Sequence, residues 1–241
     1  MIKWFAGWSV GAALSWQAIS AQQPLRDLPV HGHTPSGTPV GGVIFFSGDG
    51  GWRGFDRGNA DSLSAMGYWV LGVDDLKLFL REISADSLAR ATTAMVAYVR
   101  TSVPADAPVY LAGYSFGANV VADALGSGVR ADGVVMLGPS RRGVREITVG
   151  GYLFREPTGP TSFDVAERLN ARGCLPVAFV IGDRDTEGKG AEVFPLVRPP
   201  VERFIVPGAG HHYHGGDRRY TTVLRQALGW LERARADCRG L

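Results

Sequence analysis

The sequence predicts an α/β protein with a mostly parallel central sheet and helices on both faces. Several short runs are apolar at every position, which is typical of strands buried on both sides. These runs alternate with longer segments of helical periodicity, the order that builds a parallel sheet covered by helices. The residue types suited to catalysis follow directly after apolar runs, and ligands bind at that end of the strands in such sheets.

Length and composition indicate one globular domain of ordinary character. The chain has 241 residues, of which 45% are hydrophobic and 20% are charged, so it can form one sizeable core. We predict a single domain over residues 22–241, in which the irregular stretch 138–172 is a lid-like insertion. The net charge of +2 gives no reason to expect a nucleic-acid partner.

The first 21 residues have the pattern of a secretory signal peptide. Lys3 precedes an apolar stretch from Trp4 to Leu14, and small residues follow up to Ala21. A positive residue, a short apolar region and a small-residue cleavage site are the parts of such a signal. The apolar stretch is short for a membrane span. We therefore expect an exported protein that loses residues 1–21, with an uncleaved membrane anchor as the alternative.

The chain contains two cysteines, Cys174 and Cys238. An even number of cysteines in an exported protein permits a disulfide. Cys174 lies just before a predicted strand and Cys238 lies at the end of the last predicted helix. A bond between them would fasten that helix to the sheet, and two unpaired thiols are the alternative.

The strands are predicted from the apolar runs in chain order. Residues 22–40 are rich in Pro, Gly and polar residues and hold one short strand at most. The apolar runs then predict strands over residues 42–46, 68–73, 109–112, 133–137, 176–181 and 201–206.

The helices are predicted from the segments between these strands. One covers residues 55–66 and ends at Gly67, because glycine is common just past the end of a helix. The next is long and covers residues 84–103, with Leu88 and Met95 on one side. Further helices are predicted over residues 118–125, 163–169 and 220–236, and a hairpin around residues 146–154.

The sequence Gly-Tyr-Ser-Phe-Gly at residues 113–117 is the most informative motif in the chain. It stands between a predicted strand and a predicted helix, which is the setting of the nucleophile elbow in the α/β-hydrolase fold. The glycines permit a sharp turn that exposes the hydroxyl of the central serine. The motif therefore predicts the α/β-hydrolase fold, with Ser115 as the nucleophile.

A serine nucleophile needs a base that accepts its proton. The chain has five histidines, and His31 and His33 precede the predicted sheet, so we expect them to be out of reach. The other three follow the last strand, where the chain order of this fold places the base. We favour His211, because it directly follows the flexible Gly-Ala-Gly segment, and keep His212 as the alternative.

The acid of the triad should follow the strand predicted at residues 176–181. The chain continues there as Gly182-Asp183-Arg184-Asp185, and Asp185 is the favoured candidate, with Asp183 as the alternative. The acid would hold the imidazole in one tautomer and stabilise the imidazolium without becoming protonated itself. One of the two aspartates is expected to serve only as a turn or helix-capping carboxylate.

The developing oxyanion needs backbone N–H donors. One is expected from Phe116, the residue after the nucleophile, and the other from the loop after the first strand, residues 47–52. We favour the amide of Asp49 and next that of Gly50, whereas an ordinary Gly-rich turn is the alternative. Gly50 and Trp52 are also candidates for substrate contact.

The cluster of His211, His212, His214 and Asp217 raises the question of a metal site. The spacing is crowded and lacks the helical His-Glu-x-x-His frame. We therefore predict neither a metal nor another cofactor.

Four stretches together resemble the VirJ/AcvB family of exported bacterial α/β-hydrolases, and the resemblance spans about residues 40–235. They are FFSGDGGWRGFD at 45–56, GYWVLGVDDLKLF at 67–79, GYSFGANV at 113–120 and GAGHHYHGGD at 208–217. Ser115 matches the family nucleophile, and His211 with His212 matches the region of the family base. The resemblance implies a periplasmic protein, hydrolysis of lysyl-phosphatidylglycerol, and in plant pathogens a link to type IV secretion components and virulence.

An aminoacyl ester of lysine carries a cationic amine, which a carboxylate could bind. Asp49, Asp74 and Asp75 follow adjacent strands at the same end as Ser115, so we expect at least one of them to contact the lysyl ammonium. For Asp74 and Asp75 a structural turn is the alternative. The leading hypothesis is thus a serine hydrolase acting on an aminoacyl phospholipid at the membrane surface. The rivals are a periplasmic esterase of another small acyl substrate and a non-catalytic partner of a type IV secretion system.

Overall fold

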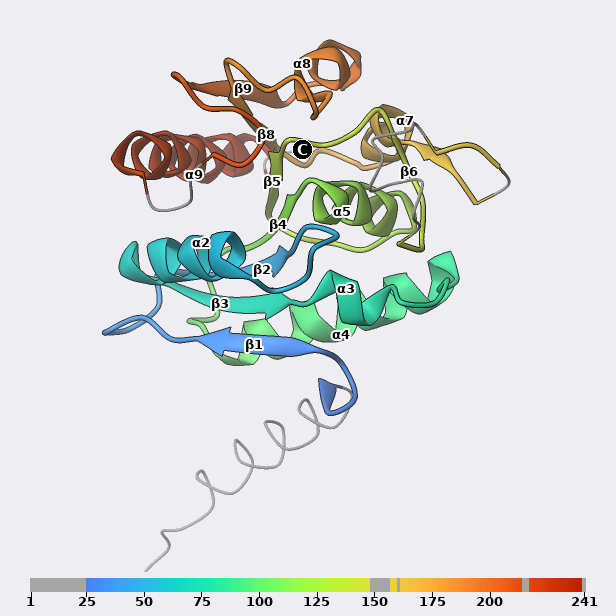
Figure 1. Cartoon of the computed structure of the whole chain (residues 1–241). Coiled ribbons are helices and arrows are strands. Elements are labelled where there is room, and N and C mark those ends of the chain that lie inside the picture. The colour runs from blue at the N-terminus through green and yellow to red at the C-terminus, as the bar shows by residue number, and fades with distance from the viewer. Residues whose placement is uncertain (1–24, 148–156, 160, 214–216, 240–241) are drawn as a thin grey trace, which may run out of the picture.

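The computed structural model describes residues 25–147, 157–159, 161–213 and 217–239. Figure 1 shows a central sheet with helices around it. The strands are β1 (Val30–His33), β2 (Gly41–Phe46), β3 (Tyr68–Val73), β4 (Val109–Tyr114), β5 (Gly133–Leu137), β6 (Arg142–Gly143), β7 (Phe163–Asp164), β8 (Val177–Gly182) and β9 (Val201–Val206). The helices are α2 (Gly54–Ala65), α3 (Asp75–Leu78), α4 (Ala85–Thr101), α5 (Phe116–Gly126), α7 (Val165–Asn170), α8 (Gly190–Val193), the 3₁₀ turn η2 (Phe194–Leu196) and α9 (Arg218–Arg239).

In the described part of the chain, seven strands form the main sheet, in the order β1-β3-β2-β4-β5-β8-β9. Every neighbouring pair is parallel except β1 and β3. Strand β4, which leads into the elbow, lies in the middle of this order, and Figure 1 shows β1 and β9 at opposite ends. The predicted α/β fold with a mostly parallel sheet is confirmed.

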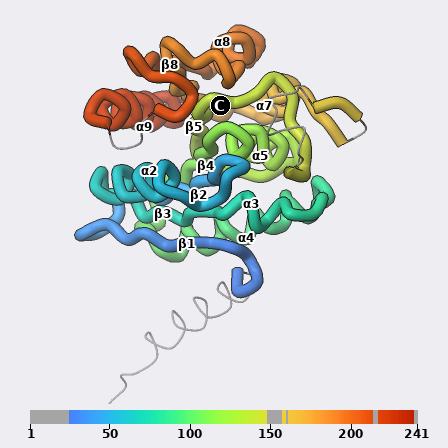
Figure 2. The backbone as a smooth tube through the Cα atoms, viewed as in Figure 1, coloured from blue at the N-terminus to red at the C-terminus, as the bar shows by residue number. Residues whose placement is uncertain are grey.

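The two faces of the sheet are covered by different helices because successive strand residues point to opposite sides. In β2, Val43 and Phe45 pack into one cluster with residues of α2 and α9, whereas Ile44 and Phe46 pack into another with residues of α4 and α5. Figure 2 shows α2 and α9 side by side, and the hydroxyl of Tyr220 in α9 donates a hydrogen bond to Asn59 in α2.

The predicted disulfide is confirmed. Cys174 and Cys238 are joined, with an S–S distance of 2.07 Å. The bond ties the segment before β8 to the last turn of α9, so the C-terminal helix is fastened covalently as well as by its apolar face. No helix among the described residues is long and apolar enough to cross a membrane.

Several local expectations differ from the structure. His31 and His33 do not precede the sheet but belong to β1, which pairs with β3 as an antiparallel edge strand. The short elements α3, α8, η2 and the β6–β7 pair were not predicted, because elements of two to four residues leave no periodicity to detect. The predicted signal peptide and most of the hairpin around residues 146–154 lie outside the described residues.

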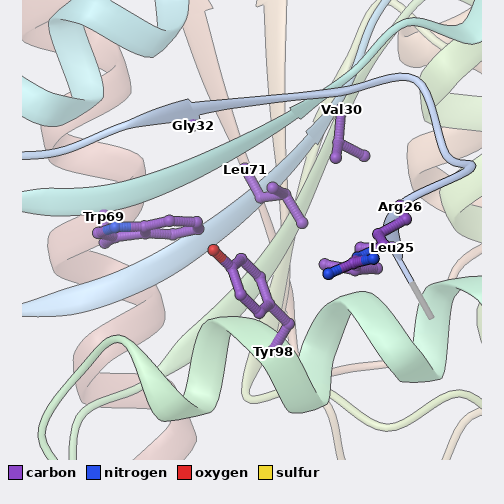
Figure 3. Close-up of a pocket in the computed structure, with 7 residues that line it drawn as sticks. All are labelled: Leu25, Arg26, Val30, Gly32, Trp69, Leu71 and Tyr98. Carbon is purple, nitrogen blue, oxygen red and sulfur yellow. The ribbon is translucent and has the colours of Figure 1, made fainter. Parts of the chain in front are cut away.

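A pocket of about 260 Å³ lies between β1, β3 and α4, and Figure 3 shows its lining. The ring of Tyr98 in α4 points toward Trp69 in β3 (Figure 3). None of the site residues expected from the sequence lines this pocket.

Candidate active site

The elbow predicted from the sequence is formed by the end of β4 and the start of α5. Ser115 has a φ of 52° and a ψ of −112°, a strained backbone conformation for a residue with a side chain. A Cβ atom on Gly113 would overlap the backbone of Gly117, and one on Gly117 would overlap the carbonyls of Phe46 and Ser47. Both positions therefore require glycine, because neighbouring backbone atoms leave no room for a Cβ atom. The elbow thus packs directly against the end of β2.

Ser115, His211 and Asp185 are joined by hydrogen bonds although they are distant in the sequence. His211 Nε2 lies 3.0 Å from Ser115 Oγ, and His211 Nδ1 lies 3.2 Å from both carboxylate oxygens of Asp185. The side chains of His211 and Asp185 are 7% and 2% exposed. This geometry matches the arrangement of nucleophile, base and orienting acid in serine hydrolases.

The surroundings of His211 fix its position. The ring of Tyr114 packs against the imidazole with 5.3 Å between centroids. Gly138 and Gly188 also lie beside the imidazole. A Cβ atom on either glycine would crowd the imidazole or the Asp185 carboxylate, so a larger residue does not fit at these positions. An imidazole held this tightly remains aligned with Ser115 Oγ.

Asp185 is held as the charged form. Burial alone raises its pKa, but the hydrogen bond from His211, the charge of His211 and the N–H groups of Gly188 and Glu187 outweigh burial, so the pKa lies below the usual value. These two N–H groups donate to Asp185 Oδ1 at 2.8 and 3.1 Å. An ionised acid is what a neighbouring imidazolium needs for stabilisation.

The alternative acid and base have other partners. Asp183 Oδ1 accepts the N–H of Gly208 at 2.7 Å, so this carboxylate closes a turn. His212 Nδ1 lies 2.8 Å from the hydroxyl of Tyr114, and the residue is exposed. His214 lies outside the described residues, and Asp217 caps its own turn by accepting the N–H of Arg219 at 2.7 Å. Within the described ranges no group of residues is arranged to hold a metal ion.

The loop expected to supply the second oxyanion donor follows β2 directly. Ser47 and Gly48 lie against the elbow, since Gly117 contacts the Ser47 carbonyl and a Cβ atom on Gly48 would touch the Tyr114 ring. Asp49 is the next residue in this loop. The other predicted donor, the N–H of Phe116, is at the first turn of α5, where helix N–H groups have no intrahelical acceptor.

Two of the three carboxylates expected to bind substrate have structural surroundings instead. Asp75 is fully buried, with both carboxylate oxygens lacking a hydrogen-bond partner in the described part of the chain. This burial contradicts its predicted contact with a substrate. Asp74 caps α3 by accepting the backbone N–H of Lys77 at 3.3 Å, and it forms an ion pair with the Lys77 ammonium group at 3.0 Å. The structure thus favours the structural-turn alternative for Asp74, whereas the Asp75 carboxylate caps no turn among the described residues.

Trp52 and Gly50, the candidates for substrate contact, also make contacts within the protein. The indole of Trp52 stacks on the His31 ring, with 5.3 Å between centroids, and lies against Gly72 in β3. It therefore packs over the β1–β3 side of the sheet, a contact that the sequence did not indicate. The Gly50 carbonyl accepts a hydrogen bond from Arg53 Nε at 2.6 Å, which stabilises the loop.

Two polar side chains that sequence reasoning missed fasten the 138–172 segment to α5. Asn119 Oδ1 accepts the N–H of Ser140 at 3.0 Å. Asp123 is fully buried and forms ion pairs with Arg145 at 2.6 Å and Arg168 at 3.1 Å. The two residues are four positions apart in α5, so they lie on one helix face, and this spacing of polar residues in an apolar helix is the signal that could have identified them.

Comparison with solved structures finds α/β hydrolases of low sequence identity. The esterase domain of a Rhodothermus marinus protein is 16% identical, with a TM-score of 0.61 over 85% of this chain and 92% of that one. Est1E from Butyrivibrio proteoclasticus is 15% identical, with a TM-score of 0.60 over 86% and 94%. The α/β hydrolase GrgF from Penicillium sp. sh18 is 15% identical, with a TM-score of 0.62 over 87% and 100%. These similarities confirm the predicted α/β-hydrolase fold.

Comparison with protein-family models agrees with the resemblance that the four sequence stretches indicated. No curated protein sequence matches the chain significantly. The family model described as bacterial virulence protein VirJ, however, matches residues 42–234, which include the elbow, both acid candidates and the His211 loop. The chain therefore belongs to the VirJ family of bacterial virulence proteins.

Proposed function

We propose that the protein is a serine hydrolase in which Ser115 is the nucleophile, His211 the base and Asp185 the orienting acid. The observation that carries this proposal is the continuous hydrogen-bonded path from Ser115 Oγ through both nitrogens of His211 to Asp185. The strained backbone at Ser115 supports it, because such strain concentrates at functional sites.

The arrangement is suited to ester cleavage by acyl transfer. Ser115 Oγ forms a bond to the ester carbonyl carbon while its proton passes to His211 Nε2. The N–H groups of Phe116 and Asp49 stabilise the oxyanion. The carbon–oxygen bond to the alcohol then breaks, and His211 returns the proton to the leaving alcohol oxygen. Water hydrolyses the acyl-serine by the same steps, with His211 again as the base.

We propose further that the substrate is an aminoacyl ester of a membrane phospholipid, of the lysyl-phosphatidylglycerol type. This choice rests on membership of the VirJ family and on the activity that the resemblance implies. Of the carboxylates first considered for the lysyl ammonium, we keep Asp49 because of its position, since it directly follows Gly48, which lies against the ring of Tyr114 beside the elbow. Asp75, by contrast, is buried.

An exported location fits this substrate, which would be met at the outer face of the inner membrane. The bond between Cys174 and Cys238 supports export, since stable disulfides are typical of oxidising compartments such as the periplasm. The predicted signal peptide is the proposed means of export.

A fluorophosphonate probe tests the proposed chemistry. We expect the wild-type protein to be labelled and Ser115→Ala to lose both labelling and ester hydrolysis, with kcat lowered at least about 10³-fold. Ser127→Ala, at the other end of α5, is the matched control and should behave as wild type. Absence of labelling in the wild type would favour a non-catalytic partner of a secretion system.

The substrate is tested separately with lipid vesicles. Purified protein is incubated with vesicles containing lysyl- or alanyl-phosphatidylglycerol, and amino-acid release is measured by mass spectrometry. We expect faster release of lysine. Hydrolysis of a small p-nitrophenyl ester without release from either lipid would instead indicate an esterase of another small acyl substrate.

A further inference from the structure

Asp56 joins the two ends of the loop at residues 48–53. It lies in the first turn of α2 and is 4% exposed. Its Oδ2 accepts the N–H of Arg53 at 3.0 Å, and its Oδ1 accepts the N–H of Gly48 at 3.4 Å. A single carboxylate thus clamps the beginning and the end of this loop, while the bond from Arg53 to Gly50 closes it from within.

Of the two ends that Asp56 holds, the one at Gly48 is in contact with the elbow. The Ser47 carbonyl lies against Gly117, and Gly48 lies against the ring of Tyr114. Asp49, the proposed oxyanion donor, follows immediately. A shift of Gly48 would therefore move that donor relative to Ser115, and oxyanion donors act only within a narrow range of distances.

Keeping a carboxylate at this place is unfavourable for stability. Burial first, and then the charge of the neighbouring Asp74, raise the pKa of Asp56 to about 6, in spite of the hydrogen bonds from Arg53 and Gly48. Asp75 is fully buried beside it and adds to the excess of acid groups. A residue whose charge lowers stability is often retained for activity.

Capping of α2 does not by itself require this carboxylate. An uncharged side chain could accept the single N–H of Arg53, as Ser84 does for the N–H of Ser87 at the start of α4. Two acceptor oxygens on one rigid group are needed only if Gly48 must be held as well. An ionised carboxylate supplies both, whereas an amide supplies one acceptor and one donor group.

We propose that Asp56 is a positioning residue that holds the 48–53 loop so that its backbone donor faces the oxyanion formed at Ser115. Asp56 touches no reacting atom and acts through Gly48. The inference rests on the proposed serine-hydrolase function and adds to it the residue that organises the oxyanion loop.

The test compares Asp56→Asn with Asp61→Asn, an exposed position on the same helix whose carboxylate contacts His33 at 3.1 Å. Both variants are assayed at pH 8 with a p-nitrophenyl ester and with an alkyl boronic acid. The boron bonds Ser115 Oγ and carries a hydroxyl at the oxyanion position, so the inhibition constant reports the donors directly. Folding is monitored by thermal unfolding in parallel.

For Asp56→Asn we expect kcat to fall about 10- to 100-fold, less than the loss of a whole donor, with KM within about twofold of wild type. The inhibition constant for the boronic acid should rise by the same factor, and the melting temperature should not fall. Asp61→Asn should match wild type in all four quantities. If Asp56→Asn does not fold, Asp56→Glu is tested in its place, because it keeps the charge but displaces the carboxylate oxygens. For this variant we likewise expect a lower kcat with a nearly unchanged KM.

Unchanged kcat and boronic-acid affinity in a folded Asp56 variant would overturn this inference and leave the proposed function intact. Equal rises in KM and falls in kcat, with unchanged boronic-acid affinity, would also overturn it. A wild-type protein that neither hydrolyses esters nor binds the boronic acid would overturn the proposed function, and the inference with it.

Discussion

Asp75 and Asp123 are both completely buried aspartates, yet their surroundings are opposite. Asp123 in α5 is paired with two guanidinium groups, those of Arg145 and Arg168. Asp75 at the start of α3 has no hydrogen-bond partner within the described residues, and its nearest charged neighbours are other acids, Asp56 and Asp74. Burial alone therefore does not tell whether a carboxylate supports the fold.

The difference follows from what each aspartate must hold. Asp123 connects the 138–172 segment to the helix that carries Ser115, so a paired charge stabilises the tertiary contact. The cation–π contacts of both arginines with Phe163, each at 5.7 Å, strengthen the same cluster. Asp75 uses its backbone, not its side chain: its N–H donates to Ser47 Oγ at 2.9 Å, next to the proposed oxyanion loop.

The largest effect is expected for Asp123→Ala. Removal of this carboxylate leaves Arg145 and Arg168 without their shared partner in a largely buried place. Loss of one member of a buried ion pair typically costs about 3–5 kcal/mol of unfolding free energy. Urea unfolding measures this loss. A change below about 1 kcal/mol would mean that the ion pairs do not hold the segment.

A smaller loss is expected when only one arginine is removed. Arg145→Ala should cost more than Arg168→Ala, because the Arg145 side chain is 14% exposed and that of Arg168 is 33% exposed. We expect about 1–3 kcal/mol for the first and less for the second, since Asp123 keeps one partner in each variant. The reverse order in urea unfolding would contradict this assignment.

The smallest change in the free energy of unfolding is expected for Asp75→Asn, and it is a gain in stability where the earlier variants lose stability. Burial first, and then the charges of Asp56 and Asp74, raise the pKa of Asp75 well above its usual value. The folded state therefore binds more protons than the unfolded state, and stability falls as the pH rises above the unfolded pKa of about 3.9. An amide has no such proton linkage, so we expect Asp75→Asn to be about 1 kcal/mol more stable than wild type at pH 8.

The pH dependence gives an internal control for that prediction. Wild-type stability should decline from about pH 4 through both groups; the contribution of Asp56, whose pKa is raised to about 6, ends near that pH, and the contribution of Asp75 continues to higher pH. Asp75→Asn should decline less steeply up to about pH 6 and should lose the decline that Asp75 causes above it. Urea unfolding at several pH values separates the two contributions, and a variant with the same pH profile as wild type would contradict the assignment to Asp75.

Much of the fold and part of the site could be predicted because their signals are local. Apolar runs alternating with helical segments predicted the parallel sheet, and the glycines around Ser115 predicted the sharp turn that the structure contains. Asp185 and His211, the proposed acid and base, were expected after the strands that precede them in the structure, but in each case two neighbouring residues of the same type competed. Asp56, Asn119 and Asp123 were missed because their partners lie in segments that only the fold brings near.

The sequence by itself determined the order of the elements, the position of the elbow and the membership of the VirJ family, since each depends on residues close together along the chain. Only the tertiary structure decided which of the neighbouring candidates meet. His211 contacts Ser115 and Asp185 contacts His211, whereas His212 and Asp183 have other partners. It also decided that Asp75 is buried and that Asp123 is paired. Side chains one residue apart point in different directions, and the partner that each one meets depends on which loops converge at the carboxyl edge of the sheet.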